Sequence, residues 1–135
     1  CGLPRRYIRF EGDESVNNLS RILGKTVVSI SGMINGSEEI IFTFSDGEFA
    51  KFYHEYDCCE TVEVEDVCGD PEDLIRYPLV VAREATVERD DEYGEHETAT
   101  FYEFATNKGS VTIRWLGRSN GYYSERVAIE YGTVS

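Results

Sequence analysis

Residues 39–54 read EIIFTFSDGEFAKFYH, two apolar runs on either side of a tight turn. From Ile40 onward large apolar side chains recur at every second position, the period of a half-buried strand. Asp46-Gly47 is a preferred two-residue hairpin turn. Asn35-Gly36 is a second turn of this kind, and it follows another alternating run at residues 25–31. Three runs joined by tight turns predict an antiparallel meander, and hence a fold built mainly from strands.

Two short helices are predicted as well. Apolar residues recur at helical spacing over residues 15–23, and Gly24 follows at the position typical of a C-cap glycine. Asp70 before Pro71 is typical of a helix start, with an N-cap aspartate and proline at the first helical position. That second helix must be short, because Pro78 disfavours its continuation.

The remaining chain shows further strand patterns, at residues 61–67, 79–88, 98–105, 110–116 and 122–131. Residues 7–10 fit either a short strand or an extended arm. Short connections favour antiparallel pairing. We therefore expect an α+β, mainly β fold: a curved antiparallel sheet or partial barrel of about seven strands, with two short helices. At 135 residues, the chain fits one domain, residues 1–135, in which residues 1–12 are the candidate arm.

The charge is strongly acidic and unevenly distributed. The chain has 13 basic and 26 acidic residues, a net charge of −13. Residues 38–97 hold 20 acids and four bases, a net of −16, whereas residues 104–129 hold four bases and one acid, a net of +3. Such a chain is not expected to coat nucleic acid through its overall field. No apolar run approaches the length of a membrane span, and no apolar stretch near residue 1 resembles a signal peptide.

One cluster has residue types that bind zinc, namely His54, Cys58, Cys59 and Cys68. The spacing disfavours a metal, because structural sites usually separate paired cysteines by two to four residues. Buried cysteines that pack as small apolar residues are the favoured interpretation. No metal, no cofactor and no disulfide is expected, the last because the chain is expected to be cytosolic.

Sequence motifs of common enzyme classes are absent: there is no phosphate-binding glycine loop, no zinc-protease helix and no nucleophile elbow. The only histidine besides His54 is His96, in an acidic stretch where a solvated side chain is expected. Cysteine catalysis by Cys58 is disfavoured, because four residues along a strand place it about 13 Å from His54. A binding module is favoured over an enzyme.

The most suggestive surface is predicted at the carboxyl end. Residues 110–116 and 122–131 are expected to pair as a hairpin that buries Trp115 on one face. The opposite face would gather guanidinium, phenol and hydroxyl groups, which suit an anionic aromatic ligand. The alternative is an amphipathic face on which these groups pair with nearby carboxylates. The candidate ligand-binding residues are Lys108, Arg114, Arg118, Asn120, Tyr122, Ser124 and Arg126.

Two motifs, D-C-C-E at residues 57–60 and S-N-G-Y-Y-S at residues 119–124, resemble an uncharacterised family of small tailed-phage and prophage proteins. The resemblance spans about residues 26–130. It implies a phage origin and a location in the cytoplasm of an infected bacterium, and it brings no known reaction or catalytic residue.

Four functions are compatible with these observations. The first is a non-catalytic phage accessory protein that counters host defence by binding, in its sharpest form by sequestering a small nucleotide. The second is an acidic decoy that inhibits a host nucleic-acid-binding enzyme. The third is an enzyme that uses the His54 and cysteine cluster, and the fourth is a structural component of the virion. The expected partner is a small anionic ligand or a host protein, and a homo-oligomer is compatible with the sequence.

Overall fold

The computed structural model of the chain describes residues 9–10, 19–56, 60–90, 96–119 and 125–133. These ranges contain nine strands and two single-turn 3₁₀ helices. The elements in chain order are β1 (Arg9–Phe10), η1 (Leu19–Ile22), β2 (Val27–Ser31), β3 (Glu39–Phe44), β4 (Glu48–Tyr53), β5 (Thr61–Cys68), η2 (Pro71–Leu74), β6 (Val81–Asp90), β7 (His96–Thr106), β8 (Gly109–Ser119) and β9 (Ala128–Thr133).

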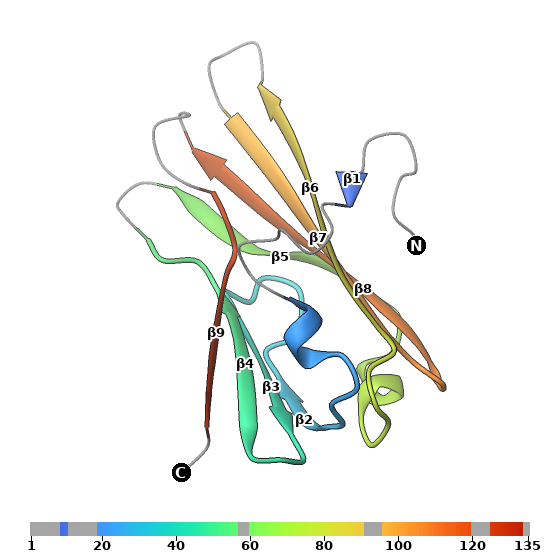
Figure 1. Cartoon of the computed structure of the whole chain (residues 1–135). Helices are drawn as coiled ribbons and strands as arrows, with labels where there is room; N and C mark the ends of the chain where they lie inside the picture. Colours follow the sequence, from blue (N-terminus) through green and yellow to red (C-terminus); the bar gives the residue numbers. More distant parts are fainter. Residues whose placement is uncertain (1–8, 11–18, 57–59, 91–95, 120–124, 134–135) are drawn as a thin grey trace.

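The strands form two sheets whose ladders are antiparallel throughout (Figure 1). One sheet has five strands in the order β1-β6-β7-β8-β5, and the other has four in the order β2-β3-β4-β9. The chain passes between the sheets from β1 to β2, then after β4 and again before β9; the last two are called the first and second crossings below. The upper ends of β6, β7 and β8 in Figure 1 extend beyond the four-stranded sheet.

The predicted antiparallel, mainly β character is confirmed, and so is the meander, because β2, β3 and β4 pair in chain order. The strands divide between two sheets, however, instead of forming the single curved sheet or partial barrel that was predicted. Alternation along a strand shows which residues share a face, but it does not show which sheet the strand joins. That assignment depends on contacts between residues distant in the sequence.

The two predicted helices are wrong, since the described residues form only one 3₁₀ turn at each place. Asp70 does cap η2, and its carboxylate accepts a hydrogen bond from the Glu72 amide at 3.0 Å. Ile75 then adopts extended backbone and forms a bridge with Val27. Pairing with strand β2 therefore ends the helix sooner than the helical pattern suggests. At η1, Gly24 has a φ of +82° and ends the turn.

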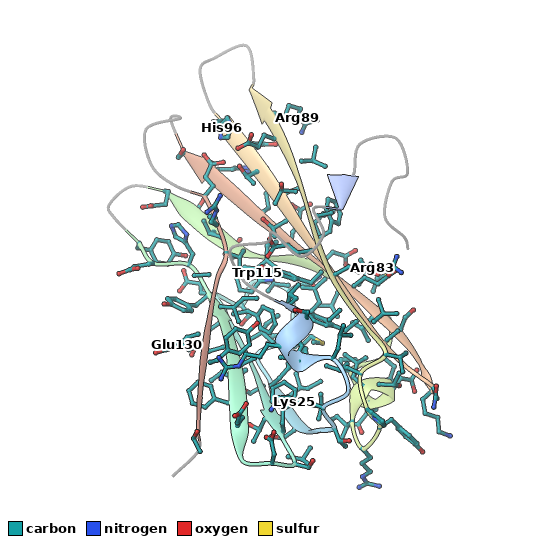
Figure 2. The ribbon with its side chains drawn as sticks, viewed as in Figure 1. Lys25, Arg83, Arg89, His96, Trp115 and Glu130 are labelled. Carbon is teal, nitrogen blue, oxygen red and sulfur yellow. The ribbon has the colours of Figure 1, made fainter. Side chains whose placement is uncertain are left out.

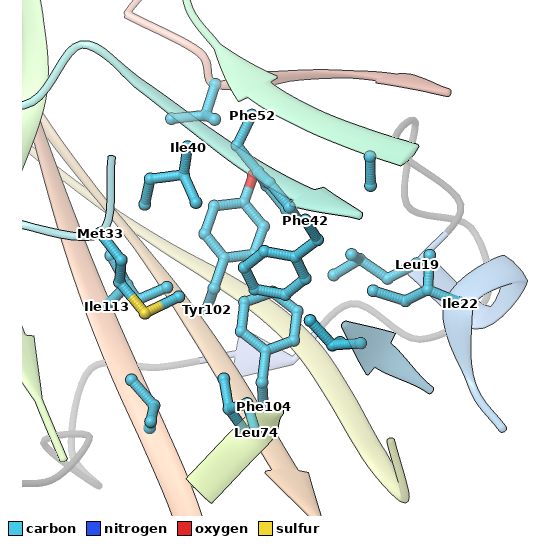
Figure 3. Packing of buried hydrophobic residues seen from close by; sticks show 14 of the residues in the cluster. Leu19, Ile22, Met33, Ile40, Phe42, Phe52, Leu74, Tyr102, Phe104 and Ile113 are labelled. Atoms are coloured by element: carbon cyan, nitrogen blue, oxygen red, sulfur yellow. The ribbon is translucent and has the colours of Figure 1, made fainter. Parts of the chain in front are cut away.

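The core lies between the two sheets and is rich in aromatic rings (Figure 3). Phe42 of β3 contacts Phe52 of β4 and Phe104 of β7, with ring centroids 5.3 and 4.9 Å apart. Phe52 also meets Tyr102 of β7 edge to face at 5.1 Å. These contacts join one sheet to the other, so the alternating aromatic residues of the meander supply the surface on which the five-stranded sheet packs.

The crossings between the sheets are fixed by a buried pair of side chains. His54, directly after β4, places Nε2 3.1 Å from Oε2 of Glu60, which precedes β5. The Nδ1 atom of His54 donates to the carbonyl oxygen of Arg126, just before β9, at 2.7 Å. One imidazole ring thus connects both crossings. In the described part of the chain, no helix has the length and apolarity to cross a membrane.

A candidate ligand groove on the five-stranded sheet

Strand β8 has two chemically different faces. Val111, Ile113 and Trp115 point into the core, and each is at most 1% exposed. The alternate residues Arg114 and Arg118 point away from the core, onto the outer face of the five-stranded sheet. The predicted separation of apolar and polar faces on this strand is confirmed for Arg114, whereas Arg118 lies on β8 only because that strand continues to Ser119, beyond its predicted end at residue 116.

The outer face is hollowed into a groove of about 590 Å³. Sites that hold small organic ligands have volumes in this range. Strands β5, β6, β7 and β8 contribute the lining residues, namely Glu65, Val87, Glu88, Arg89, Glu97, Ala99, Phe101, Arg114, Leu116 and Arg118. Three arginines and three glutamates among them give a formally neutral groove in a chain whose net charge is −13.

At one end of the groove, a carboxylate of β7 holds two guanidinium groups. Glu97 is paired with Arg89 of β6 and Arg118 of β8 in the two ladders. One carboxylate oxygen accepts a hydrogen bond from Arg89 Nη2 at 3.0 Å, and the other forms an ion pair with Arg118, 3.0 Å from its Nε atom. The Glu97 side chain is only 19% exposed, whereas those of Arg89 and Arg118 are 77% and 56% exposed. The positive groups thus lie outermost and the negative group lies beneath them.

The next outward-facing residues, two positions from Glu97 on β7 and from Arg118 on β8, form an apolar floor to the groove. Ala99 is paired with Val87 on one side and with Leu116 on the other. The small side chain of Ala99 in the centre of this row lowers the floor between bulkier neighbours. Phe101, in the row beyond, is 7% exposed. A flat ring can therefore rest against the sheet at Ala99 without displacing a charged group.

At the other end, Arg114 lies beside a bulge in β5. The register of the β5–β8 ladder shifts between Val64 and Asp66, which leaves Glu65 as the extra residue. Bulges commonly redirect a side chain in this way. Arg114 Nη2 donates to Glu65 Oε1 at 2.6 Å. The Nε–H group of Arg114 is buried and has no hydrogen-bond partner among the described residues.

The predicted hairpin between residues 110–116 and 122–131 is wrong. Strand β8 pairs with β7 and β5, and β9 pairs with β4 in the other sheet. Ile129 and Tyr131 of β9, with Val127 just before it, pack on the core from the four-stranded sheet. Arg114 and Arg118 line the same groove, at opposite ends of it, whereas Asn120, Tyr122 and Ser124 lie outside the described residues.

Two other predicted site residues lie elsewhere. The Lys108 ammonium group is near the Tyr77 ring, 5.6 Å from its centroid, in the turn at the opposite end of β8 from Arg118. Arg126 lies in the crossing before β9, and its charge acts on Tyr102, which faces the core. Lys108 and Arg126 therefore do not share a surface with Arg118.

Arg89, Glu97 and Ala99 were not among the predicted site residues. They lie on β6 and β7, and the ladder register, not the chain order, places them beside Arg118. The predicted strands at residues 79–88 and 98–105 include Ala99 but stop short of Arg89 and Glu97, which the structure places at the ends of β6 and β7. Nothing in the sequence gave their neighbours.

The two described members of the cysteine cluster, His54 and Cys68, lie apart. His54 pairs with Glu60 just before β5, while Cys68 ends that strand, about 23 Å from its first residue at the usual rise per residue. Cys68 is disulfide-bonded, contrary to prediction, and Cys58 and Cys59 lie outside the described residues. Within the described ranges, no three metal-ligating side chains come together. The expectation of reduced cysteines rested on an assumed cytosolic location, which the disulfide does not support.

His96 is held in place, not simply solvated as predicted. Its Nδ1 atom lies 2.9 Å from both oxygens of Glu125, a buried carboxylate that also accepts from the Ser119 hydroxyl. Figure 2 shows His96 and Arg89 at the same end of β6 and β7. This network anchors the second crossing to the inner face of the sheet, behind the arginine end of the groove.

Comparison with known proteins shows a family match over most of the chain. A family model described as a domain of unknown function, DUF7448, covers residues 20–129. No curated protein matches the chain, and no solved structure does. The matched region contains strands β2 to β8 and the first two residues of β9, and it leaves out β1. All the residues that line the groove lie inside it.

Proposed function

The chain belongs to the DUF7448 family, and we propose that it is a non-catalytic binding protein that captures a small anionic ligand in the outer groove of its five-stranded sheet. One observation carries the proposal: Arg89, Arg114 and Arg118 line a hollow whose floor is apolar. Arginine recognises phosphate and carboxylate groups with paired, charge-assisted hydrogen bonds.

The contacts that the groove's carboxylates already make favour an anion over a cation as the ligand. Glu97 is committed to two arginines and Glu65 to Arg114, so these carboxylates already have partners. Each guanidinium has five N–H groups, and these contacts use few of them. The donors that remain on Arg89 and Arg118 lie at the surface.

A nucleotide is the ligand class that we propose. Its flat base suits the apolar row at Ala99, and its phosphate suits the arginines at either end. In this proposal the protein sequesters the nucleotide and performs no reaction on it. The biological setting that we propose is a phage accessory protein that counters host defence, on the strength of the sequence motifs at residues 57–60 and 119–124.

Isothermal titration of the full chain against a panel of nucleoside monophosphates, cyclic nucleotides and ADP-ribose tests the proposal. We expect at least one nucleotide to bind, and Arg118→Gln to weaken it about tenfold, the loss of one charge-assisted contact. Arg83→Gln is the matched control, because Arg83 is an exposed arginine of β6 outside the groove. No binding across the panel, or equal effects of the two substitutions, overturns the proposal.

A second candidate function is the acidic decoy, favoured by the exposed carboxylates of Glu63, Glu65 and Asp66 on β5. Such a protein would bind the basic surface of a nucleic-acid-binding enzyme. Capture from host lysate at low and high salt distinguishes it, because an ionic complex of this kind dissociates as salt rises. A partner that needs Glu63 and Asp66 but not Arg118 would favour the decoy.

A further inference from the structure

The groove has a charged row at each end and an apolar row between them. Along β8 the sequence of outward residues is Arg114, Leu116, Arg118. Residues four apart on a strand are separated by about 13 Å. The two arginine rows therefore do not converge on one anion, but provide two separate anion sites joined by an apolar floor.

From this spacing we infer that the groove takes an elongated ligand with a flat apolar body and an anionic group at each end. This inference rests on the proposed function and specifies its ligand class. One anionic group binds between Arg89 and Arg118, and the other binds Arg114. The body lies along the row that contains Ala99.

The end at Arg118 is organised before any ligand binds. Glu97 holds the guanidinium groups of both strands on either side of β7, at 3.0 Å each. Fixing donors in this way lowers the entropy lost when an anion binds. Glu97 is therefore a positioning residue for this end of the ligand.

The end at Arg114 is organised differently. Its guanidinium has one partner, Glu65, and a buried Nε–H without an acceptor among the described residues. An unpaired buried donor is costly. If the Arg114 guanidinium turns toward an anionic group bound here, that group supplies the acceptor that Nε–H lacks. This gain favours ligands that reach both ends of the groove.

Two synthetic ligands with the same flat body test the inference directly. They are a biphenyl with a carboxylate on each ring and the matching biphenyl with a carboxylate on one ring only. A nucleoside monophosphate and a nucleoside with phosphates on two positions form the second pair. Affinities are measured by isothermal titration for the unsubstituted chain, Arg114→Gln, Arg118→Gln and the control Arg83→Gln, each checked for an unchanged thermal unfolding midpoint.

We expect at least one two-ended ligand to bind about tenfold more tightly than its one-ended partner. Arg114→Gln and Arg118→Gln should each abolish that advantage, and Arg83→Gln should preserve it. Equal affinity for one-ended and two-ended ligands overturns the inference but leaves the proposed function standing. The inference is also overturned if the advantage survives Arg114→Gln. If no anion binds at all, both the inference and the proposed function fall.

Discussion

Gly117 of β8 lies directly against Glu125, because a Cβ atom on residue 117 would lie 2.7 Å from the Cβ atom of Glu125. The same added carbon would approach the Glu125 carbonyl oxygen at 3.0 Å and Val62 at 3.2 Å. Glu125 is itself fixed by its contacts with His96 and Ser119. The second crossing can therefore pack on the sheet only where β8 has no side chain.

Gly117→Ala should lower the free energy of unfolding by about 1–3 kcal/mol, the usual cost of overpacking a buried contact. Urea unfolding measures this change. Ser110→Ala on the same strand is the control, because Ser110 is exposed, and its effect should stay within about 0.5 kcal/mol. Equal stability of the two variants would contradict the close packing of Glu125 on β8.

Glu60→Ala should be strongly destabilising, because both members of the His54–Glu60 pair are buried. It leaves His54 buried without its carboxylate, and the two side chains are 2% and 0% exposed. Leaving a buried polar group without its hydrogen-bond partner costs about 1–3 kcal/mol. Glu103→Ala is the comparison, since the Arg83–Glu103 pair is long, at 3.8 Å, and partly exposed, so its loss should cost at most about 1 kcal/mol. Chemical unfolding of both variants decides whether the crossings depend on this pair.

Stability should fall at alkaline pH because of two tyrosines. Burial, with the nearby Glu84 carboxylate, holds the pKa of Tyr102 well above its usual value of 10.0. Burial likewise raises the pKa of Tyr131 to about 12. Above pH 10 the unfolded chain loses phenol protons that the folded chain retains, so the free energy of unfolding falls as pH rises, through about pH 12 for Tyr131.

Urea unfolding on either side of pH 10 measures this effect, and Tyr102→Phe should make the decline less steep. Tyr102 donates to Glu84 at 2.5 Å, so the variant also loses a hydrogen bond at neutral pH. The slope with pH, not the stability at one pH, is therefore the decisive quantity. A slope unaffected by Tyr102→Phe would argue against a buried, protonated phenol.

Phe42→Ala should be among the most destabilising changes in the core. Phe42 is fully buried and contacts rings from both sheets. The expected loss is about 3–5 kcal/mol. Val28→Ala, at a position that is 48% exposed on the neighbouring strand, should change stability by no more than about 0.5 kcal/mol. If both changes had small effects, the two sheets would not share one core.

Cys68 should be unreactive toward thiol reagents until the protein is reduced, because it is disulfide-bonded. Mass spectrometry after alkylation, with and without prior reduction, measures this. Reduction or Cys68→Ser should lower stability by about 2–4 kcal/mol. Labelling of Cys68 in the folded, unreduced protein would show that the thiol is free and would restore the expectation of a reduced chain.

The sequence by itself determined the approximate positions of most strands, the alternating faces of β3 and β4 and the turn at Asp46-Gly47, because these follow from the two-residue period and from turn chemistry between near neighbours. It placed Trp115 in the core and Arg114 on the opposite face of their strand. Only the tertiary structure decided that β9 pairs with β4 and not with β8, and that Arg89 and Glu97 lie beside Arg118. Those pairings depend on which distant segments bury each other's apolar faces, and alternation along one strand holds no information about its neighbours.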